Sequence, residues 1–183
     1  DYPFVGVSYW YSHMGGSEFV GSAHAVFPYV NYPIIRNRKH ELNFRVGVGL
    51  AYLTKRFERL ENYKYIAIGS HVNAAINLMA EYRWRFIPRM NAAIGMGLMH
   101  FSNGSTKTPN FGINTPSVNL AFAYRLSKEN SYLNKKIIPS LYSFEFPGTK
   151  SIDFSLGATA ALKDMGSEYG RSFMIYNFFG NVM

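Results

Sequence analysis

The sequence predicts an all-β protein, an antiparallel transmembrane β-barrel with about eight strands in this chain. Apolar residues alternate with small or polar ones along most of the sequence, which is the period of a β-strand. The alternating runs exceed the five or six residues of a typical soluble strand and match the roughly 9–11 residues that cross a bilayer. The second face carries Gly, Ala, Asn and Ser, as the interior of a narrow barrel does.

The length suits one domain, so we expect a single barrel domain spanning residues 1–183. Aromatic residues make up 17% of the chain and charged residues only 16%, below the average of about 25% for soluble domains. The chain has no cysteine, which excludes disulfides and thiolate metal sites. The sequence contains no run of about 18 apolar residues, so it predicts no transmembrane helix. The opening residues Asp1-Tyr2-Pro3 lack the features of a signal peptide, as expected of a mature or trimmed chain.

The first half of the chain contains four predicted strands. Alternation near residues 5–12 ends at a Gly-Gly turn, and the apolar stretch 19–35 is expected to bend because it contains two prolines. Residues 42–52 alternate almost perfectly. Residues 72–86 give the longest run, with an apolar face from Val72 to Phe86 and a second face that includes Glu81.

The second half adds four more predicted strands, over residues 90–102, 117–126, 152–162 and 172–182. A longer loop is expected over residues 127–150. Closure of the sheet would remove its exposed edges, which favours a barrel. The last run is aromatic and ends with the sequence, so a larger barrel of which this chain is a fragment is the alternative.

The formal net charge of +8 is concentrated in basic clusters. They lie at residues 36–39, 55–59 and 135–136. Two interpretations are open: the clusters belong to solvated loops, or they attract anionic lipid or phosphate groups.

Two polar residues end an otherwise apolar row on the fifth predicted strand. His100 and Ser102 follow Leu98 at a spacing of two, so all three side chains point the same way. In a membrane barrel this row faces lipid. The same parity, without an intervening bulge, turns Asn114 outward on the next strand. We therefore expect a lipid substrate for any site here, and not a water-soluble one.

These residue types suit acyl transfer. A serine hydroxyl becomes a nucleophile when a histidine takes its proton, and a third group must hold the imidazole in the correct tautomer. Ser102, His100 and Asn114 are the candidates for these three roles. Candidate oxyanion or substrate-binding groups are Asn103, Asn110 and the backbone at Gly104. The alternative is that the polar residues lie at the membrane interface without a catalytic role.

The segment that carries these residues resembles a known family. His100-Phe101-Ser102-Asn103, followed by Lys107, Pro109-Asn110 and Gly112-Ile113, is similar to the active-site segment of PagL-type lipid A 3-O-deacylases, called acyloxyacyl hydrolases in bacteria related to Bacteroides. The resemblance implies a Gram-negative outer-membrane barrel that removes an ester-linked acyl chain from lipid A with a Ser-His-Glu triad on its lipid-facing wall.

The resemblance also implies roles for single residues. It makes His100 the base and Ser102 the nucleophile, and it places Asn103 and Asn110 near the oxyanion. The glutamate of the family falls at Asn114 in this sequence.

The sequence therefore predicts a lipid A deacylase-like serine esterase, a carboxylic ester hydrolase. Its expected partners are lipopolysaccharide and membrane lipid, and no nucleic acid or cofactor is expected. No metal is expected either, because the five histidines lack ligand spacing. One alternative is a catalytically weak or inactive barrel that is structural or binds lipopolysaccharide, which Asn114 favours. Another is a small-molecule channel, although eight strands leave little room for a pore.

Overall fold

The computed structural model describes residues 3–15, 18–88, 90–125, 153–164 and 172–182. Within these ranges the regular structure consists of antiparallel β-strands and contains no helix, which confirms the all-β prediction. No helix in this part of the chain is long and apolar enough to cross a membrane. The strands are β1 (Phe4–His13), β2 (Ser22–Arg36), β3 (His40–Leu53), β4 (Val72–Ile87), β5 (Met90–Ser102), β6 (Ile113–Arg125), β7 (Asp153–Asp164) and β8 (Ser172–Val182).

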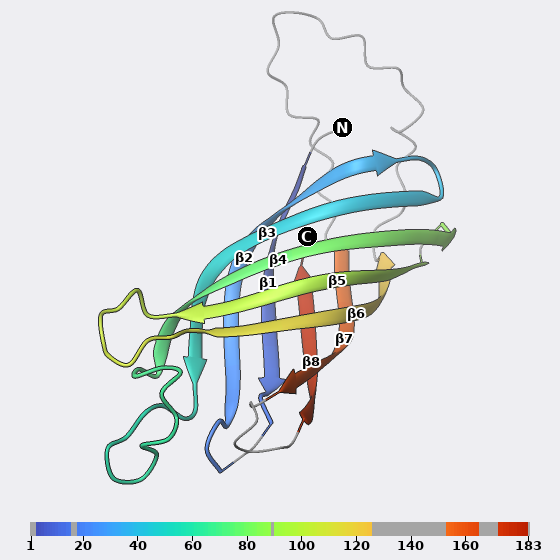
Figure 1. Cartoon of the computed structure of the whole chain (residues 1–183). Helices are drawn as coiled ribbons and strands as arrows, with labels where there is room; N and C mark the ends of the chain where they lie inside the picture. Colours follow the sequence, from blue (N-terminus) through green and yellow to red (C-terminus); the bar gives the residue numbers. More distant parts are fainter. Residues whose placement is uncertain (1–2, 16–17, 89, 126–152, 165–171, 183) are drawn as a thin grey trace, which may run out of the picture.

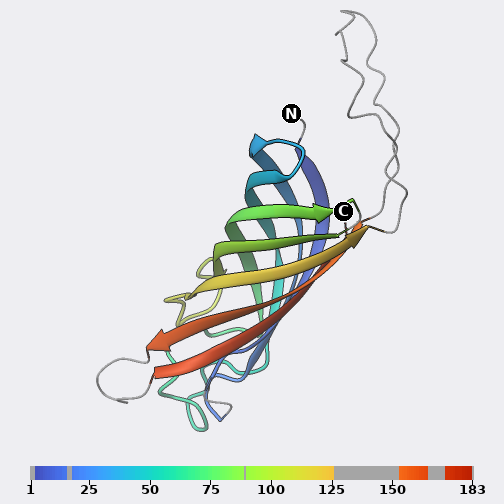
Figure 2. The same cartoon turned by 90° about the vertical axis from the view of Figure 1, so that its right-hand side faces the viewer.

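Each strand pairs with the next one along the chain, and β1 to β6 form a continuous, strongly curved sheet (Figure 1). Pairing continues through β7 and β8, and β8 pairs with β1, so the hydrogen-bonded order returns to its start. Figure 2 shows β7 and β8 running along the side of the sheet next to β6.

Two strands differ in detail from the predicted ones. The expected bend in β2 occurs as a register shift between Pro33 and Ile35, whereas Pro28 lies within the paired region opposite Val7. Strand β6 begins at Ile113, four residues earlier than its alternation indicates. The predicted loop 127–150 lies outside the described residues.

The alternation has the direction expected of a membrane barrel. On β3, Val48 and Leu50 are exposed on the outer wall, whereas Asn43 and Arg45 are buried inside. A soluble sheet packs its apolar face on the core. The outer wall instead presents large apolar side chains from strand after strand. They include Val5, Val7, Val26, Val48, Leu50, Val72, Ile94, Met96, Val118, Leu120 and Phe122.

The interior is filled by side chains. Trp10 and Phe27 are buried there, and the Arg45 guanidinium carbon lies 4.0 Å from the centre of the Tyr29 ring. An interior cavity of about 20 Å³ has room for about one water molecule. In the part of the chain that the structure describes, these side chains occupy space that a channel would need.

Connections of different length lie at the two ends of the strands. Among the described connections, the turns after β2 (37–39) and after β4 (at residue 88) are short and lie at one end (Figure 1). The connections 14–21, 54–71 and 103–112 lie at the other end. Buried apolar residues pack where these longer connections meet. They include Met14, Val20, Leu53, Tyr65 and Ile68.

The register of β2 and β3 predicts that position 49 accepts no larger side chain. A Cβ at Gly49 would press on the Val26 carbonyl oxygen and lie 2.6 Å from the Phe27 Cα, and backbone cannot move aside cheaply. We expect Gly49→Val to lower the free energy of unfolding by about 1–3 kcal/mol, measured by urea titration of the protein in detergent micelles.

Val48→Leu is the control for this substitution, because Val48 is exposed on the outer wall. Its effect should stay within about 0.5 kcal/mol. Equal stability of the two variants would contradict the packing of β2 against β3.

Candidate active site

Phe101 fixes the direction of the two polar residues beside it. Its side chain is fully buried inside the sheet, with its ring centre 5.5 Å from that of Trp10. Successive side chains of a strand point to opposite faces, so His100 and Ser102 lie on the outer wall, where both are half-buried. This is the orientation that the sequence predicts for them.

His100 is held by the neighbouring strand. Its register partner on β6 is Asn114, and His100 Nδ1 lies 2.7 Å from Asn114 Oδ1. Because β6 begins at Ile113, Asn114 belongs to the strand and not to the turn. With the amide oxygen as acceptor, Nδ1 carries the hydrogen and Nε2 is the basic nitrogen. The structure thus brings two of the predicted site residues together.

A glycine provides the space for the imidazole. Gly112 has a φ of 76°, which favours glycine, and a Cβ at this position would lie 3.0 Å from His100 Cε1. A side chain at this position would therefore crowd the ring and strain the backbone.

Ser102 is held by the turn that follows it. The Asn110 side-chain amide donates to Ser102 Oγ over 3.1 Å, and the Gly104 backbone N–H donates over 3.2 Å. The hydroxyl in turn lies 3.4 Å from Asn110 Oδ1. Among the described residues, no hydrogen bond joins Ser102 to His100. Two N–H donors therefore converge on the hydroxyl oxygen.

Asn103 lies in the same turn, but its side chain points elsewhere. Its amide nitrogen donates to Ser70 Oγ and to the Lys107 carbonyl oxygen, both over 2.8 Å. Its backbone N–H donates to Asn110 Oδ1 over 3.1 Å. The sequence predicts Asn103 as an oxyanion or substrate-binding group, but its side chain does not point to the site. Asn103 follows the outward residue Ser102, so its side chain turns inward. In the structure Asn103 braces the turn.

The connection 54–71 supports this turn from the side. Ile68 forms an isolated β-bridge with Asn110, and the Gly112 N–H donates to the Ala67 carbonyl oxygen over 3.0 Å. A Cβ at Gly69 would lie 2.7 Å from the Thr108 carbonyl oxygen, so the two connections approach as closely as backbones can.

Ser70 and Asn73 complete this support. Ser70 Oγ donates to Asn73 Oδ1 over 2.8 Å and accepts from Asn103. The sequence did not identify these two residues, because Ser70 contacts the turn across 33 positions of the chain and Asn73 acts through Ser70. No periodic signal marks such a contact.

The surroundings of the site carry charge but offer no metal ligands. Lys55, Arg59 and Lys107 lie on connections at this end, whereas the cluster 36–39 lies at the opposite end of β3. Among the described residues, no group of His, Cys, Asp or Glu could hold a metal ion. Burial raises the pKa of the Tyr65 phenol, which therefore stays neutral.

Comparisons with known proteins place the chain in a family. No curated protein and no solved structure gave a significant match. A sequence model described as "Lipid A 3-O-deacylase (PagL)" matches residues 2–123, more than half of the chain. The matched range contains His100, Ser102 and Asn114. The chain therefore belongs to the lipid A 3-O-deacylase (PagL) family.

Proposed function

We propose that this protein is an outer-membrane serine esterase that hydrolyses an ester-linked acyl chain of lipid A. Residues 1–183 form one domain in this proposal, a transmembrane barrel of about eight strands. The observation that carries the proposal is the 2.7 Å contact between His100 Nδ1 and Asn114 Oδ1, beside Ser102 on an apolar outer wall. Family membership supports lipid A as the substrate.

The reaction begins at the Ser102 hydroxyl. The residues at positions 100 and 102 share one face of β5, with their Cα atoms about 6.6 Å apart, so the hydroxyl can turn from Asn110 toward His100 Nε2. His100 takes the proton as Ser102 Oγ attacks the ester carbonyl carbon. As the tetrahedral intermediate collapses, the bond between the carbonyl carbon and the sugar oxygen breaks, and that oxygen takes the proton from His100 and leaves as a hydroxyl. Water then hydrolyses the acyl-enzyme, again with His100 as base, and the fatty acid is released.

The oxyanion would be stabilised by the donors that hold Ser102 in the free protein. The Gly104 N–H and the Asn110 amide both point at Ser102 Oγ, and the carbonyl oxygen of the substrate comes to lie beside that atom during attack. These donors are in place before the reaction begins, and they pass from Ser102 Oγ to the carbonyl oxygen of the substrate as the hydroxyl turns toward His100. Asn103 acts as a positioning residue in this scheme, through its N–H bond to Asn110.

The location of the site suits a substrate that stays in the membrane. An acyl chain can lie along the outer wall, where Leu98 and Val72 are exposed next to the polar residues. Lys55 and Arg59 extend from the connection 54–71 at the same end. Basic side chains at this end of the strands can bind the phosphate groups of lipid A.

The first test is acyl release from purified lipid A by the protein refolded in detergent, followed by mass spectrometry. We expect Ser102→Ala and His100→Ala to lower kcat/KM at least about 10³-fold, because either change removes the nucleophile or its base. Ser105→Ala, in the exposed part of the same turn, is the control and should retain activity. Release by Ser102→Ala at the control rate would overturn the proposed nucleophile.

The second test concerns the third position of the triad. Asn114→Glu should raise kcat at least about tenfold, because a carboxylate at Asn114 would stabilise the imidazolium that forms during attack. Asn114→Ala should lower it, because the ring then loses its 2.7 Å partner.

Asn114 also favours a second candidate function, a barrel that binds lipopolysaccharide but is catalytically weak or inactive. Activity that is undetectable in the natural sequence but present in Asn114→Glu would support this candidate. A decrease in Asn114→Glu would contradict the proposed geometry of the triad.

The third test separates positioning from catalysis at Asn103. Asn103→Ala removes the bonds to Ser70 and Lys107, and we expect kcat to fall about tenfold with little change in KM, because the turn that holds Ser102 loosens. Hydrogen exchange of the amides in 103–112 should become faster. Lys107→Ala keeps the accepting carbonyl and is the matched control. An unchanged kcat in Asn103→Ala would exclude the positioning role.

A further inference from the structure

A second cluster of charge lies far from the candidate active site. Arg36, Arg38, Lys39 and Arg85 lie at the end of the strands opposite to His100, and we call these four residues the basic turn. Strand β3 separates the basic turn from the connection 54–71 by 14 residues, or about 45 Å of extended chain. In a membrane barrel the two basic regions therefore meet opposite leaflets.

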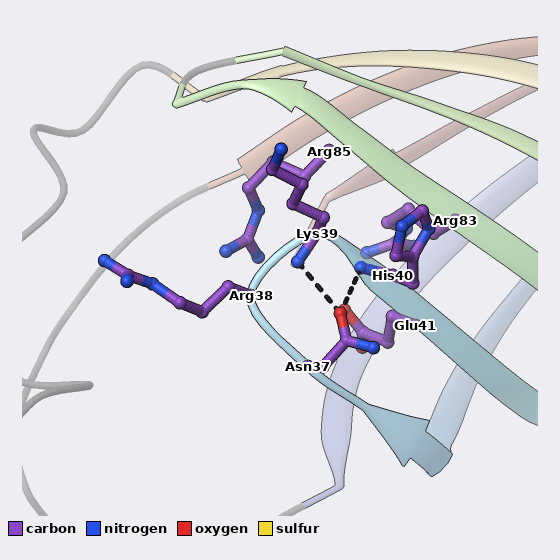
Figure 3. A pocket seen from close by; sticks show the side chains of 7 residues that line it. All are labelled: Asn37, Arg38, Lys39, His40, Glu41, Arg83 and Arg85. Carbon is purple, nitrogen blue, oxygen red and sulfur yellow. Dashed lines mark hydrogen bonds between the residues drawn. The ribbon is translucent and has the colours of Figure 1, made fainter.

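Hydrogen bonds hold the backbone of the basic turn. Asn37 Oδ1 accepts the backbone N–H groups of Lys39, over 3.0 Å, and of His40, over 2.8 Å (Figure 3). The Arg85 backbone N–H donates to the Lys39 carbonyl oxygen over 2.7 Å and ties the turn to β4. Arg38 and Lys39 are exposed at its tip.

Positive charge exceeds negative charge around the shallow pocket at this turn. Its charged lining consists of four cationic side chains and one carboxylate: Arg38, Lys39, Arg83, Arg85 and Glu41. The nearby carboxylates already have cationic partners. Glu41 lies 4.0 Å from Arg36, and Glu81 lies 2.8 Å from Arg83. The exposed positive charge of Arg38 and Lys39 suits an anionic group from outside the chain.

The outer wall next to the basic turn is apolar and aromatic. Ile34 and Ile35 are exposed on β2, and Trp84 and Phe86 are exposed on β4. Trp84 is the register partner of His40, whose Nδ1 lies 2.6 Å from the Tyr82 hydroxyl. Aromatic residues beside basic ones are typical of the boundary between hydrocarbon and headgroups.

We propose that the basic turn binds the phosphate of an acidic phospholipid in the leaflet opposite to the candidate active site, with the acyl chains lying on the wall around Trp84. The inference rests on the membrane placement in the proposed function. The adjoining apolar wall favours a lipid over a free phosphate ion, because a phosphate ion has no acyl chain that could contact this wall. Each basic residue near such a surface contributes about a fivefold gain in binding.

Trp84 provides a local probe for the test. The chain has two tryptophans, of which Trp10 is 6% exposed inside the sheet and Trp84 is 49% exposed on the outer wall. The protein is reconstituted into phosphatidylcholine vesicles that contain either brominated phosphatidylcholine or brominated phosphatidylglycerol. Quenching by each lipid reports its occupancy next to Trp84, and a Trp84→Phe variant gives the contribution of Trp10.

We expect brominated phosphatidylglycerol to quench Trp84 more strongly than brominated phosphatidylcholine at equal mole fraction. The double variant Arg38→Gln/Lys39→Gln should lower the relative binding constant of the acidic lipid at least about fivefold. The matched control Lys55→Gln/Arg59→Gln loses the same charge at the other end and should keep the preference.

Equal quenching by the two lipids, or an undiminished preference in the Arg38→Gln/Lys39→Gln variant, would overturn the headgroup site and leave the membrane placement intact. Absence of quenching by either lipid would overturn the membrane placement, and the headgroup site with it. The measurement uses no enzymatic readout, so failure of the proposed esterase activity would not affect it.

Discussion

The strict alternation of side chains across the sheet is the constraint on which the rest of this structure depends. On β5, Phe101 packs against Trp10 inside the sheet. Its neighbours His100 and Ser102 must therefore face outward. A slip of one residue would move both groups inside, beside Arg45 and away from any lipid. The apolar outer wall and the candidate active site therefore have one cause, which is the parity of the strands.

The hydroxyl at the candidate site depends on contacts that parity does not supply. Asn110 holds Ser102 through its side chain, while its backbone bridges to Ile68 in another connection. Ser70 reaches the same turn through Asn103. The turn is thus fixed by packing between two connections, one of which is buried against the apolar residues around Ile68. A rigid support of this kind is what a preorganised oxyanion site requires.

Alternation predicted the antiparallel sheet, most of its strands and the outward direction of three site residues, whereas the runs 19–35 and 172–182 were predicted from their apolar and aromatic content. The start of β6 was missed because Asn114, Thr115 and Pro116 hide the period, although they pair in register with β5. Contacts between the connections 54–71 and 103–112 were missed because they join residues far apart in sequence. From the sequence, all the basic clusters have the same interpretation, but the order of the strands places 36–39 and 55–59 at opposite ends of β3.

The acid of a catalytic triad orients the imidazole and stabilises its positive charge, and Asn114 can supply only the first of these contributions. Its amide oxygen orients the imidazole as a carboxylate would, at 2.7 Å from Nδ1. It carries no charge, so it cannot offset the positive imidazolium that forms during attack. That charge interaction at 4 Å ranges from about 1 kcal/mol in water to about 4 kcal/mol at an effective dielectric of 20. In the proposed membrane placement the site lies toward the larger value. With Asn114 the free protein would then need no charged carboxylate beside hydrocarbon, where desolvation is costly. The site thus retains the orientation of its base but loses its electrostatic stabilisation, which is the physical basis for expecting slow catalysis.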